Sequence, residues 1–241
     1  MIPVAETVDI IGVSHERGRG ANAVRTLNGI DLSVSAGELV AIMGPSGSGK
    51  STLMSIAAGL EIPTHGHVYI RGDDITRMTL GQRAEIRRSV VGYVHQNSEL
   101  ILGLSAVENV ALPVELGGGS YRKARKAAMR ALEELELESL ADRFPDELSS
   151  GEVQRVTIAR ALVGRRAVVL ADEPTSALDV AGGDAVMAVL RRAADNGVAV
   201  LFITHEARYA AWADRTIFLR SGAIADRTRE DRIEDLLRGT L

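Results

Sequence analysis

A glycine-rich stretch in the first quarter of the chain carries residue types that bind phosphate. The sequence GPSGSGKST at 44–52 follows the apolar run ELVAIM and precedes the helix-like run LMSIAAGL. Glycines at this spacing let successive backbone N–H groups turn inward, and the positive end of the following helix adds to their attraction for an anion. Because the flanking strand and helix patterns are also present, the stretch predicts a phosphate-binding P-loop rather than an ordinary glycine-rich turn.

The side chains of this loop predict a nucleoside triphosphate bound with Mg²⁺. We expect Lys50 to reach the β- and γ-phosphates as a positive charge, and the Ser51 hydroxyl to join the coordination shell of the metal. The residues expected to contact the nucleotide here are Gly44, Pro45, Ser46, Gly47, Ser48, Gly49, Lys50, Ser51 and Thr52.

A second chemical pattern is an apolar run that ends in two acids. VVLADE at 168–173 is typical of a buried strand with Asp172 and Glu173 at its carboxyl edge. There Asp172 would hold Mg²⁺, directly or through water, and Glu173 would polarise the water that attacks the γ-phosphate. The alternative is a strand that ends in a solvated acidic turn, and the P-loop elsewhere in the chain favours the catalytic interpretation.

The elements that must position these residues change character along the chain. Short β-type runs at 7–13, 30–34, 38–43 and 67–72 predict an antiparallel layer beside the nucleotide core. Helical periodicity at 105–114, 120–138 and 151–163 indicates a helical insertion. Strand patterns at 166–173, 198–205 and 215–222 then alternate with helices over 181–194 and 206–212, which is typical of a mostly parallel sheet. The segment 231–241 is expected to be at most a short amphipathic helix.

Composition and charge exclude several classes of protein. With 241 residues, 46% of them hydrophobic, the chain can bury a full core without disulfides, and it has no cysteine. Its apolar runs, such as VAVLFI at 198–203, fall far short of the roughly 20 residues that cross a bilayer. The N-terminal stretch has an acid where a secretory signal carries basic residues, so we expect a cytoplasmic protein. A net charge of −4 argues against nucleic acid as a partner.

A basic run, YRKARKAAMR at 121–130, leads into the acidic ALEELELE. The run could be the solvated face of a helix or a contact with anionic lipid. We favour the solvated face, because basic clusters that bind membranes usually lie on a more strongly amphipathic or juxtamembrane element.

The segment LSSGEVQRVTIARAL at 148–162 completes a set of motifs. In their types and order the chain resembles an ATP-binding-cassette (ABC) ATPase over essentially its whole length. The resemblance implies one domain, 1–241, with the α/β fold of P-loop NTPases. Residues of about 1–95 and 165–241 would form a mostly parallel core with an antiparallel β subdomain, and about 96–164 a helical subdomain.

The resemblance also implies roles for further residues. Gln96, after the strand pattern VVGYVH, would be the Q-loop glutamine that senses Mg²⁺ and couples to a partner, and His205 would contact the γ-phosphate. The signature loop would comprise Ser149, Ser150, Gly151 and Glu152, and the D-loop Ser176, Ala177, Leu178 and Asp179. In such families the signature loop of one subunit closes over the ATP of the other, so the resemblance implies a head-to-tail homodimer or heterodimer.

Two of these segments have simpler interpretations as well. Ser149 and Glu152 form the S-x-x-E pattern of a helix capping box, while the free N–H groups of the same helix start suit an anionic phosphate, and both can hold at once. A single histidine after an apolar strand is commonly structural, so only the resemblance assigns His205 to the γ-phosphate.

The chain departs from the family pattern at two places. Ser150 stands where the signature has glycine, and its side chain would crowd the phosphate and slow hydrolysis if that backbone took a positive φ. The adenine-stacking aromatic is missing from SHERGRG at 14–20, where His15 is the candidate, with a smaller ring that predicts modest affinity and poor purine selectivity. Neither change removes Asp172, Glu173 or His205, so we predict an active ATPase.

The segments ENVALPVEL, LADEPTSALD and AAWADRTIFLRSGAI are similar to those of the lipoprotein-release and macrolide-exporter type. The resemblance implies the ATP-hydrolysing subunit of a membrane transporter, peripheral on the inner face of the membrane. It would dimerise on MgATP and pass its closing motion to a separate integral-membrane permease in export or mechanotransmission. The alternatives are an amino-acid-type importer and a cell-division-type mechanical ATPase. A DNA-repair or ribosome-associated ABC protein is disfavoured, because those proteins usually carry coiled-coil insertions or two cassettes.

Overall fold

A six-stranded sheet forms the centre of the protein, whose computed structural model describes residues 6–18, 24–97 and 99–229. Its strand order is β10 (Ala223–Arg229), β9 (Arg215–Arg220), β3 (Leu39–Met43), β8 (Ala199–Ile203), β7 (Val168–Asp172) and β6 (Val91–Val94). Neighbouring strands are parallel except β10 against β9. The strands β3, β7 and β8 are buried at every position, as expected for a parallel sheet covered on both faces. The predicted mostly parallel core is confirmed.

An antiparallel sheet packs beside it. This second sheet has the order β2 (Val24–Ser35), β1 (Glu6–Arg17), β4 (His65–Ile70) and β5 (Asp73–Asp74). The prediction that the run at 38–43 belongs to this layer was wrong, since that run is β3 and pairs with β8 and β9. Burial on both faces explains the difference, because only the central sheet offers a strand two covered faces.

Helices cover both faces of the central sheet. One set of alternating strand residues, which includes Ile42 and Leu201, packs against α1 (Lys50–Ala57) and the antiparallel sheet. The other set, which includes Ala41 and Phe202, packs against α6 (Val180–Asp195) and the helices beyond it. The remaining helices near this sheet are α2 (Leu80–Ser89), the 3-10 turn η2 (Ile75–Arg77) and α7 (Ala207–Ala210), which is shorter than the helix predicted over 206–212.

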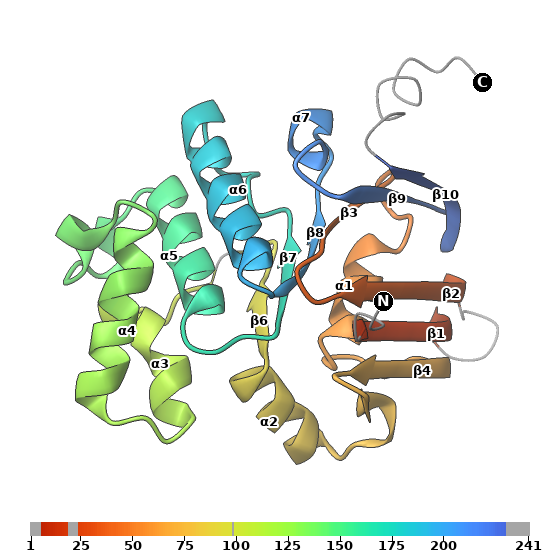
Figure 1. Ribbon diagram of the computed structural model, residues 1–241, viewed down its shortest axis with the longest axis horizontal. Coiled ribbons are helices and arrows are strands. Elements are labelled where there is room, and N and C mark those ends of the chain that lie inside the picture. Colours follow the sequence, from red (N-terminus) through yellow and green to blue (C-terminus); the bar gives the residue numbers. More distant parts are fainter. Residues whose placement is uncertain (1–5, 19–23, 98, 230–241) are drawn as a thin grey trace.

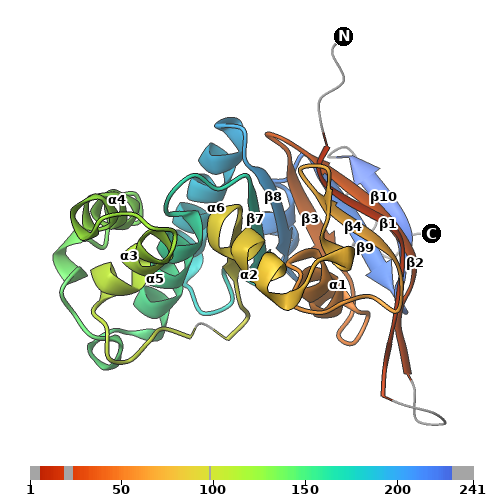
Figure 2. The ribbon, with the colours of Figure 1, turned by 90° about the horizontal axis from the view of Figure 1, so that it is seen from below.

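Three helices form a separate layer at the side far from the antiparallel sheet (Figures 1 and 2). These are α3 (Ala106–Leu116), α4 (Tyr121–Glu133) and α5 (Ser150–Leu162), with the 3-10 turns η3 (Glu138–Leu140) and η4 (Pro145–Glu147) between the last two. Of the basic run on α4, residues Arg122, Lys123, Lys126 and Arg130 are exposed, as a solvated helix face requires. Within the described ranges, none of the helices has the length and apolar character needed to cross a bilayer.

The helix predicted over 120–138 ends five residues early, at Glu133. The N–H of Leu137 donates to the Leu132 carbonyl at 3.0 Å and that of Glu136 to Glu133 at 3.1 Å, while Glu136 takes a left-handed φ of 57°. These are the bonds of a Schellman C-cap. The turn they make directs Leu135 and Leu137 into the core, and that burial outweighs continued helix formation.

Two elements, α2 and β10, were not predicted from the sequence. In α2 a capping box between Thr79 and Gln82 fixes the start, but Arg83 is its only buried residue, so the segment has no apolar periodicity. Strand β10 lies at the edge of the central sheet next to β9. The segment 231–241, predicted to be at most a short helix, lies outside the described residues.

We predict that Glu136→Gly stabilises the protein, because glycine takes a left-handed φ without the cost that Cβ adds. The expected gain is roughly 1 kcal/mol, or a rise of about 2–4 °C in Tm. The matched control is Glu134→Gly, where φ is −62° and glycine weakens the helix end, so Tm should fall. Equal losses in both variants, measured by thermal unfolding, would contradict the strained turn.

Candidate functional site

The loop between β3 and α1 is held by close contacts between backbones. A Cβ atom at Gly44 would lie 2.1 Å from the Leu219 carbonyl oxygen, and one at Gly49 would lie 2.5 Å from that of Thr26. Both glycines also have φ values that side chains disfavour, 149° and 102°. The loop therefore keeps its curled shape, with the start of α1 and its free N–H groups facing the concave side, and no acidic residue lies in the first turn of α1 to oppose an anion.

Lys50, the first residue of α1, lies inside this loop. Its side chain donates from Nζ to the carbonyl oxygens of Gly44, at 2.8 Å, and Pro45, at 3.0 Å, and the residue is 6% exposed. Burial lowers the pKa of Lys50, and the negative charges of Glu173 and Asp172 partly oppose that effect. The arrangement holds a cation at the point where the loop would receive phosphate.

Asp172, the last residue of β7, is 3% exposed, and burial raises its pKa despite a hydrogen bond with Ser51. Its Oδ1 atom is buried and has no hydrogen-bond partner. A carboxylate oxygen left without a partner costs stability unless a cation or a donor binds there. Oxygen donors from Asp172 and Ser51 at one place fit a hard divalent cation such as Mg²⁺.

Three polar side chains meet where β6, β7 and β8 end. Glu173 follows β7, and its Oε1 lies 2.6 Å from Nε2 of His205, which comes two residues after β8. Gln96, beyond β6, donates from Nε2 to Oε2 of Glu173 at 3.4 Å. The carboxyl ends of neighbouring parallel strands thus supply an acid, an imidazole and an amide to one point.

Glu173 has a left-handed backbone, with φ of 52°. Its N–H donates to the Ile203 carbonyl at 3.2 Å, and its own carbonyl accepts from the N–H and the hydroxyl of Ser176, at 3.2 Å and 3.0 Å. These bonds from both sides hold a conformation that a non-glycine residue adopts only at a cost. The side chain is thereby aimed at the loop that contains Lys50.

A cavity of about 290 Å³ joins the loop to these three side chains. Its lining is Arg17, Thr26, Ser46, Gly47, Gly49, Lys50, Ser51, Thr52, Gln96, Glu173 and His205. The structure thus brings together most of the residues predicted for nucleotide and water, while Gly44, Pro45 and Ser48 complete the loop outside this lining. Sequence reasoning missed Arg17 and Thr26. The position of Arg17 in the SHERGRG segment, where a base-stacking residue was expected, could have indicated its place in the cavity. No sequence pattern indicated Thr26.

The structure does not bring His15 to this cavity. The His15 side chain is 12% exposed, and its Nε2 lies 3.2 Å from Oε2 of Glu61. The imidazole is mostly buried and the residue is absent from the lining of the cavity, so the structure does not support the choice of His15 as the stacking residue. The physical reason is a shift in the β1–β2 register on either side of His15, which determines the side chains that face the loop.

The predicted signature loop caps α5 and faces a different hollow. Ser149 Oγ accepts from the N–H of Glu152, and Glu152 Oε2 accepts from that of Ser149 at 2.7 Å, which is a complete capping box. Ser150 is the first residue of α5 and is not in the left-handed region, so the crowding considered for a positive φ does not arise.

That hollow is a groove of about 460 Å³ shared with the predicted D-loop. A Cβ at Gly151 would lie 3.3 Å from Cδ2 of Leu178, and Asp179 caps α6 by accepting from the N–H of Gly182 at 2.9 Å. The groove contains Ser149, Ser150, Gly151, Glu152, Ala177, Leu178 and Asp179, and shares no lining residue with the cavity at the P-loop. Ser176 lies between the two, at the carbonyl of Glu173.

A buried glutamine that sequence reasoning missed links the two regions. Gln154 of α5 donates from Nε2 to the Pro174 carbonyl at 3.0 Å, directly after Glu173. Its signal in the sequence was a long polar side chain one turn before the buried Ile158 of the same helix.

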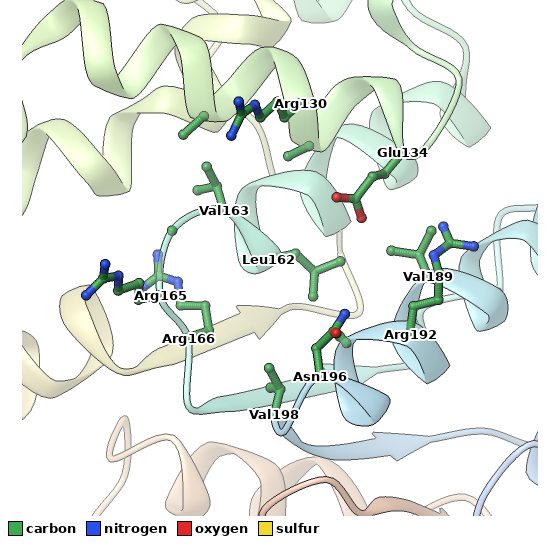
Figure 3. Close-up of a pocket in the computed structure, with 14 residues that line it drawn as sticks. Arg130, Glu134, Leu162, Val163, Arg165, Arg166, Val189, Arg192, Asn196 and Val198 are labelled. Carbon is green, nitrogen blue, oxygen red and sulfur yellow. The ribbon is translucent and has the colours of Figure 1, made fainter.

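A larger groove of about 780 Å³ lies elsewhere, between α4, the segment after α5 and the end of α6 (Figure 3). Arginines from all three elements, Arg130, Arg165, Arg166 and Arg192, surround an apolar floor that includes Leu162 and Val198. It contains none of the residues of the P-loop or of the strand ends, so it is not part of the candidate site.

Comparison with known proteins gives consistent findings. Residues 27–176 match the family described as ABC transporter. The chain is 43% identical, over 95% of its length, to the macrolide export ATP-binding/permease protein MacB of Brucella melitensis, but it spans only about a third (35%) of that relative. It is 41% identical to an ABC transporter ATP-binding protein of Methanocaldococcus jannaschii, MJ1508, covering 87% of this chain and 93% of that one.

Solved structures agree with the sequence comparison. The dimeric structure of the ATP-binding cassette MJ0796 in a post-hydrolysis state, bound to ADP and Pi, superposes with a TM-score of 0.88. The two chains are 37% identical, and the match covers 92% of this chain and 98% of that one.

The raised pKa of Asp172 gives a prediction for stability. The folded protein holds the Asp172 proton more tightly than the unfolded chain does, so this group makes stability fall as pH rises from the ordinary Asp value, about 3.9, through the raised folded value. Asp172→Asn removes the buried charge and should raise the Tm of the ligand-free protein at pH 8, by about 2–4 °C if the gain is roughly 1 kcal/mol.

The difference from wild type should shrink as pH is lowered through the same window. Asp73→Asn, at an exposed aspartate, is the control and should leave Tm unchanged. A lower Tm for Asp172→Asn at pH 8 would contradict the proposed cost of the unpartnered carboxylate.

Proposed function

This chain belongs to the ATP-hydrolysing cassettes of the ABC transporter family, and from that premise we propose that a pair of such chains closes on ATP to drive a membrane permease. The observation that carries the proposal is one cavity that contains Lys50 and Glu173, with Asp172 hydrogen-bonded to Ser51 at its wall. A phosphate-binding cation, a metal-binding carboxylate and a carboxylate for water are the groups that phosphoryl transfer to water requires.

Different residues of the chain have different roles in ATP hydrolysis. The N–H groups of the loop and Lys50 bind the β- and γ-phosphates, and Glu173 accepts the proton of the attacking water. His205, 2.6 Å from Glu173, orients that carboxylate and donates toward the γ-phosphate. Mg²⁺, when held by Asp172, Ser51 and Gln96, supplies positive charge that offsets the charge of the phosphates.

The separation of the two hollows supports a paired active unit. The signature loop and the P-loop line different cavities of the same chain, so a second chain in head-to-tail orientation is needed to bring Ser149 and Gly151 to the bound nucleotide. The helix start of α5 then offers its N–H groups to the γ-phosphate. Loss of that phosphate removes the charge that joins the subunits, and the pair opens.

A surface beside Gln96 suits the permease. A groove of about 400 Å³ lies between α2, β6 and α3, with an apolar wall that includes Tyr93, Leu112 and Leu116, and with Arg87 and Arg160 among its polar residues. The groove is next to β6, which leads to Gln96. A movement of Gln96 at the nucleotide site could therefore be passed to a permease segment docked in this groove. We therefore propose a cytoplasmic subunit held at the membrane through its permease.

We favour export or mechanotransmission over import, because relatives at about 40% identity carry macrolide-export names with both ATP-binding and permease functions. An amino-acid-type importer and a cell-division-type mechanical ATPase remain the alternatives, and a role on nucleic acid is disfavoured by the net charge of −4.

The test is Glu173→Gln, which keeps the shape of the side chain but cannot take a proton. We expect ATP turnover to fall at least ~100-fold while MgATP binding is kept, and light scattering in saturating MgATP to show a stable dimer. Lys50→Ala should lose both binding and dimer. Glu206→Gln, next to His205 but outside the cavity lining, is the control and should turn over at the wild-type rate. Wild-type turnover in Glu173→Gln would refute the catalytic assignment.

A further inference from the structure

The strand order determines which way a nucleotide must lie in the cavity, given the proposed function. Gln96, Glu173 and His205 follow β6, β7 and β8, which are all on one side of β3 and its P-loop. The β1–β2 hairpin lies on the other side, where the N–H of Asn28 donates to the carbonyl of Gly222 between β9 and β10 at 2.8 Å. A triphosphate whose γ end faces Glu173 therefore directs its sugar and base toward the hairpin.

The hairpin contributes two residues to the cavity, Arg17 and Thr26. Thr26 is packed against the start of α1, since a Cβ at Gly49 would lie 2.5 Å from its carbonyl oxygen, and its hydroxyl donates to the His15 carbonyl at 3.1 Å. Arg17 is 56% exposed, and its Nη2 lies 2.7 Å from Oε1 of Glu61. The guanidinium, paired with Glu61 and otherwise exposed, is thus the planar group at this end of the cavity.

We propose that Arg17 is the residue that faces the purine base, with its guanidinium plane stacked on the ring. A guanidinium is planar and delocalised and stacks on aromatic faces. The cavity lining contains no Phe, Tyr or Trp side chain that could do the same. The ion pair with Glu61 limits the positions of Arg17, so less conformational freedom is lost when a base binds.

Glu61 also explains why His15 does not take this role. Each of its two carboxylate oxygens contacts a different side chain: Oε2 contacts His15, and Oε1 contacts Arg17. The first contact is with the mostly buried imidazole, and the second is with the exposed guanidinium. Because Glu61 follows α1, the helix that begins at the P-loop also positions the group for the base.

This arrangement predicts weak discrimination between purines. A stacked plane recognises the face of a ring and not the donors and acceptors along its edge, and the Thr26 hydroxyl is already engaged with the His15 carbonyl. ATP and GTP should bind with affinities within a fewfold of each other.

The test compares ATP, GTP and inorganic triphosphate, which has no base, by calorimetric titration of the full chain. Arg17→Ala should weaken ATP and GTP binding about tenfold, the range of one lost stacking contact, and leave triphosphate binding unchanged. Arg17→Tyr should retain ATP binding, because it restores a ring plane. Arg17→Lys should resemble Arg17→Ala, because it keeps the charge but not the plane. Arg25→Ala, at the other arginine of this hairpin with a carboxylate partner, is the matched control and should bind as wild type.

Two results would overturn the inference: unchanged ATP affinity in Arg17→Ala, or an equal loss of ATP and triphosphate that Arg17→Lys repairs, which would make Arg17 a phosphate contact. Failure of the proposed function is distinct, since the wild-type protein would then bind neither triphosphate nor ATP, or would bind ATP without forming a pair. Circular dichroism of each variant verifies that the protein is folded.

Discussion

The close approach of backbones around the P-loop is the constraint on which the rest of the site depends. Gly44 touches the Leu219 carbonyl of β9, and Gly49 touches the Thr26 carbonyl of β2, at distances that leave no room for Cβ. The N–H of Gly222 donates to the Ser48 carbonyl at 3.0 Å and completes the junction. Because the loop is clamped between the two sheets, the parallel sheet supplies the phosphate end of the cavity and the antiparallel sheet supplies the other end.

From this fixed point, one segment connects the nucleotide to the signature region. Residues 172–182 begin with the metal-binding candidate and the strained Glu173, continue past Pro174, which Gln154 holds, and end at the cap of α6. Leu178 in this segment packs against Gly151 of the signature loop. The segment thus contacts α5 at two points, Pro174 and Leu178. Helix α5 in turn packs on α3 and α4 in the helical layer. This contiguous path gives a physical route by which the charge on the nucleotide can affect the position of the helices.

The sequence predicted the parts of the site whose local chemistry is distinctive. The roles of Gly44, Gly49, Lys50 and the two acids at 172–173 could be predicted, because few other structures need those residue types at that spacing. Segments whose structure depends on packing against distant parts of the chain were harder to predict from the sequence. Strand β3 was assigned to the wrong sheet because its burial on two faces depends on strands far along the chain. The helix at 120–138 was predicted to be too long because no sequence pattern indicates that Glu136 takes a left-handed conformation.

The base end of the cavity shows the same limit. His15 and Arg17 are two residues apart on one strand, and their chemistry alone favoured the imidazole. A local register shift in the β1–β2 pairing and the position of Glu61, 44 residues beyond Arg17, decide which side chain reaches the cavity. Neither can be derived from spacing, because both depend on how the hairpin packs against the end of α1.

Crosslinking between chains can show whether the P-loop of one chain and the signature loop of another enclose one nucleotide. The chain has no cysteine, so tagged Ser46→Cys and untagged Ser150→Cys proteins, both carrying Glu173→Gln, can be mixed and treated with a short bis-maleimide. We expect a crosslink between tagged and untagged chains in MgATP and its loss in MgADP. A mixture in which both proteins bind MgATP but no Ser46-to-Ser150 crosslink forms between chains would contradict it.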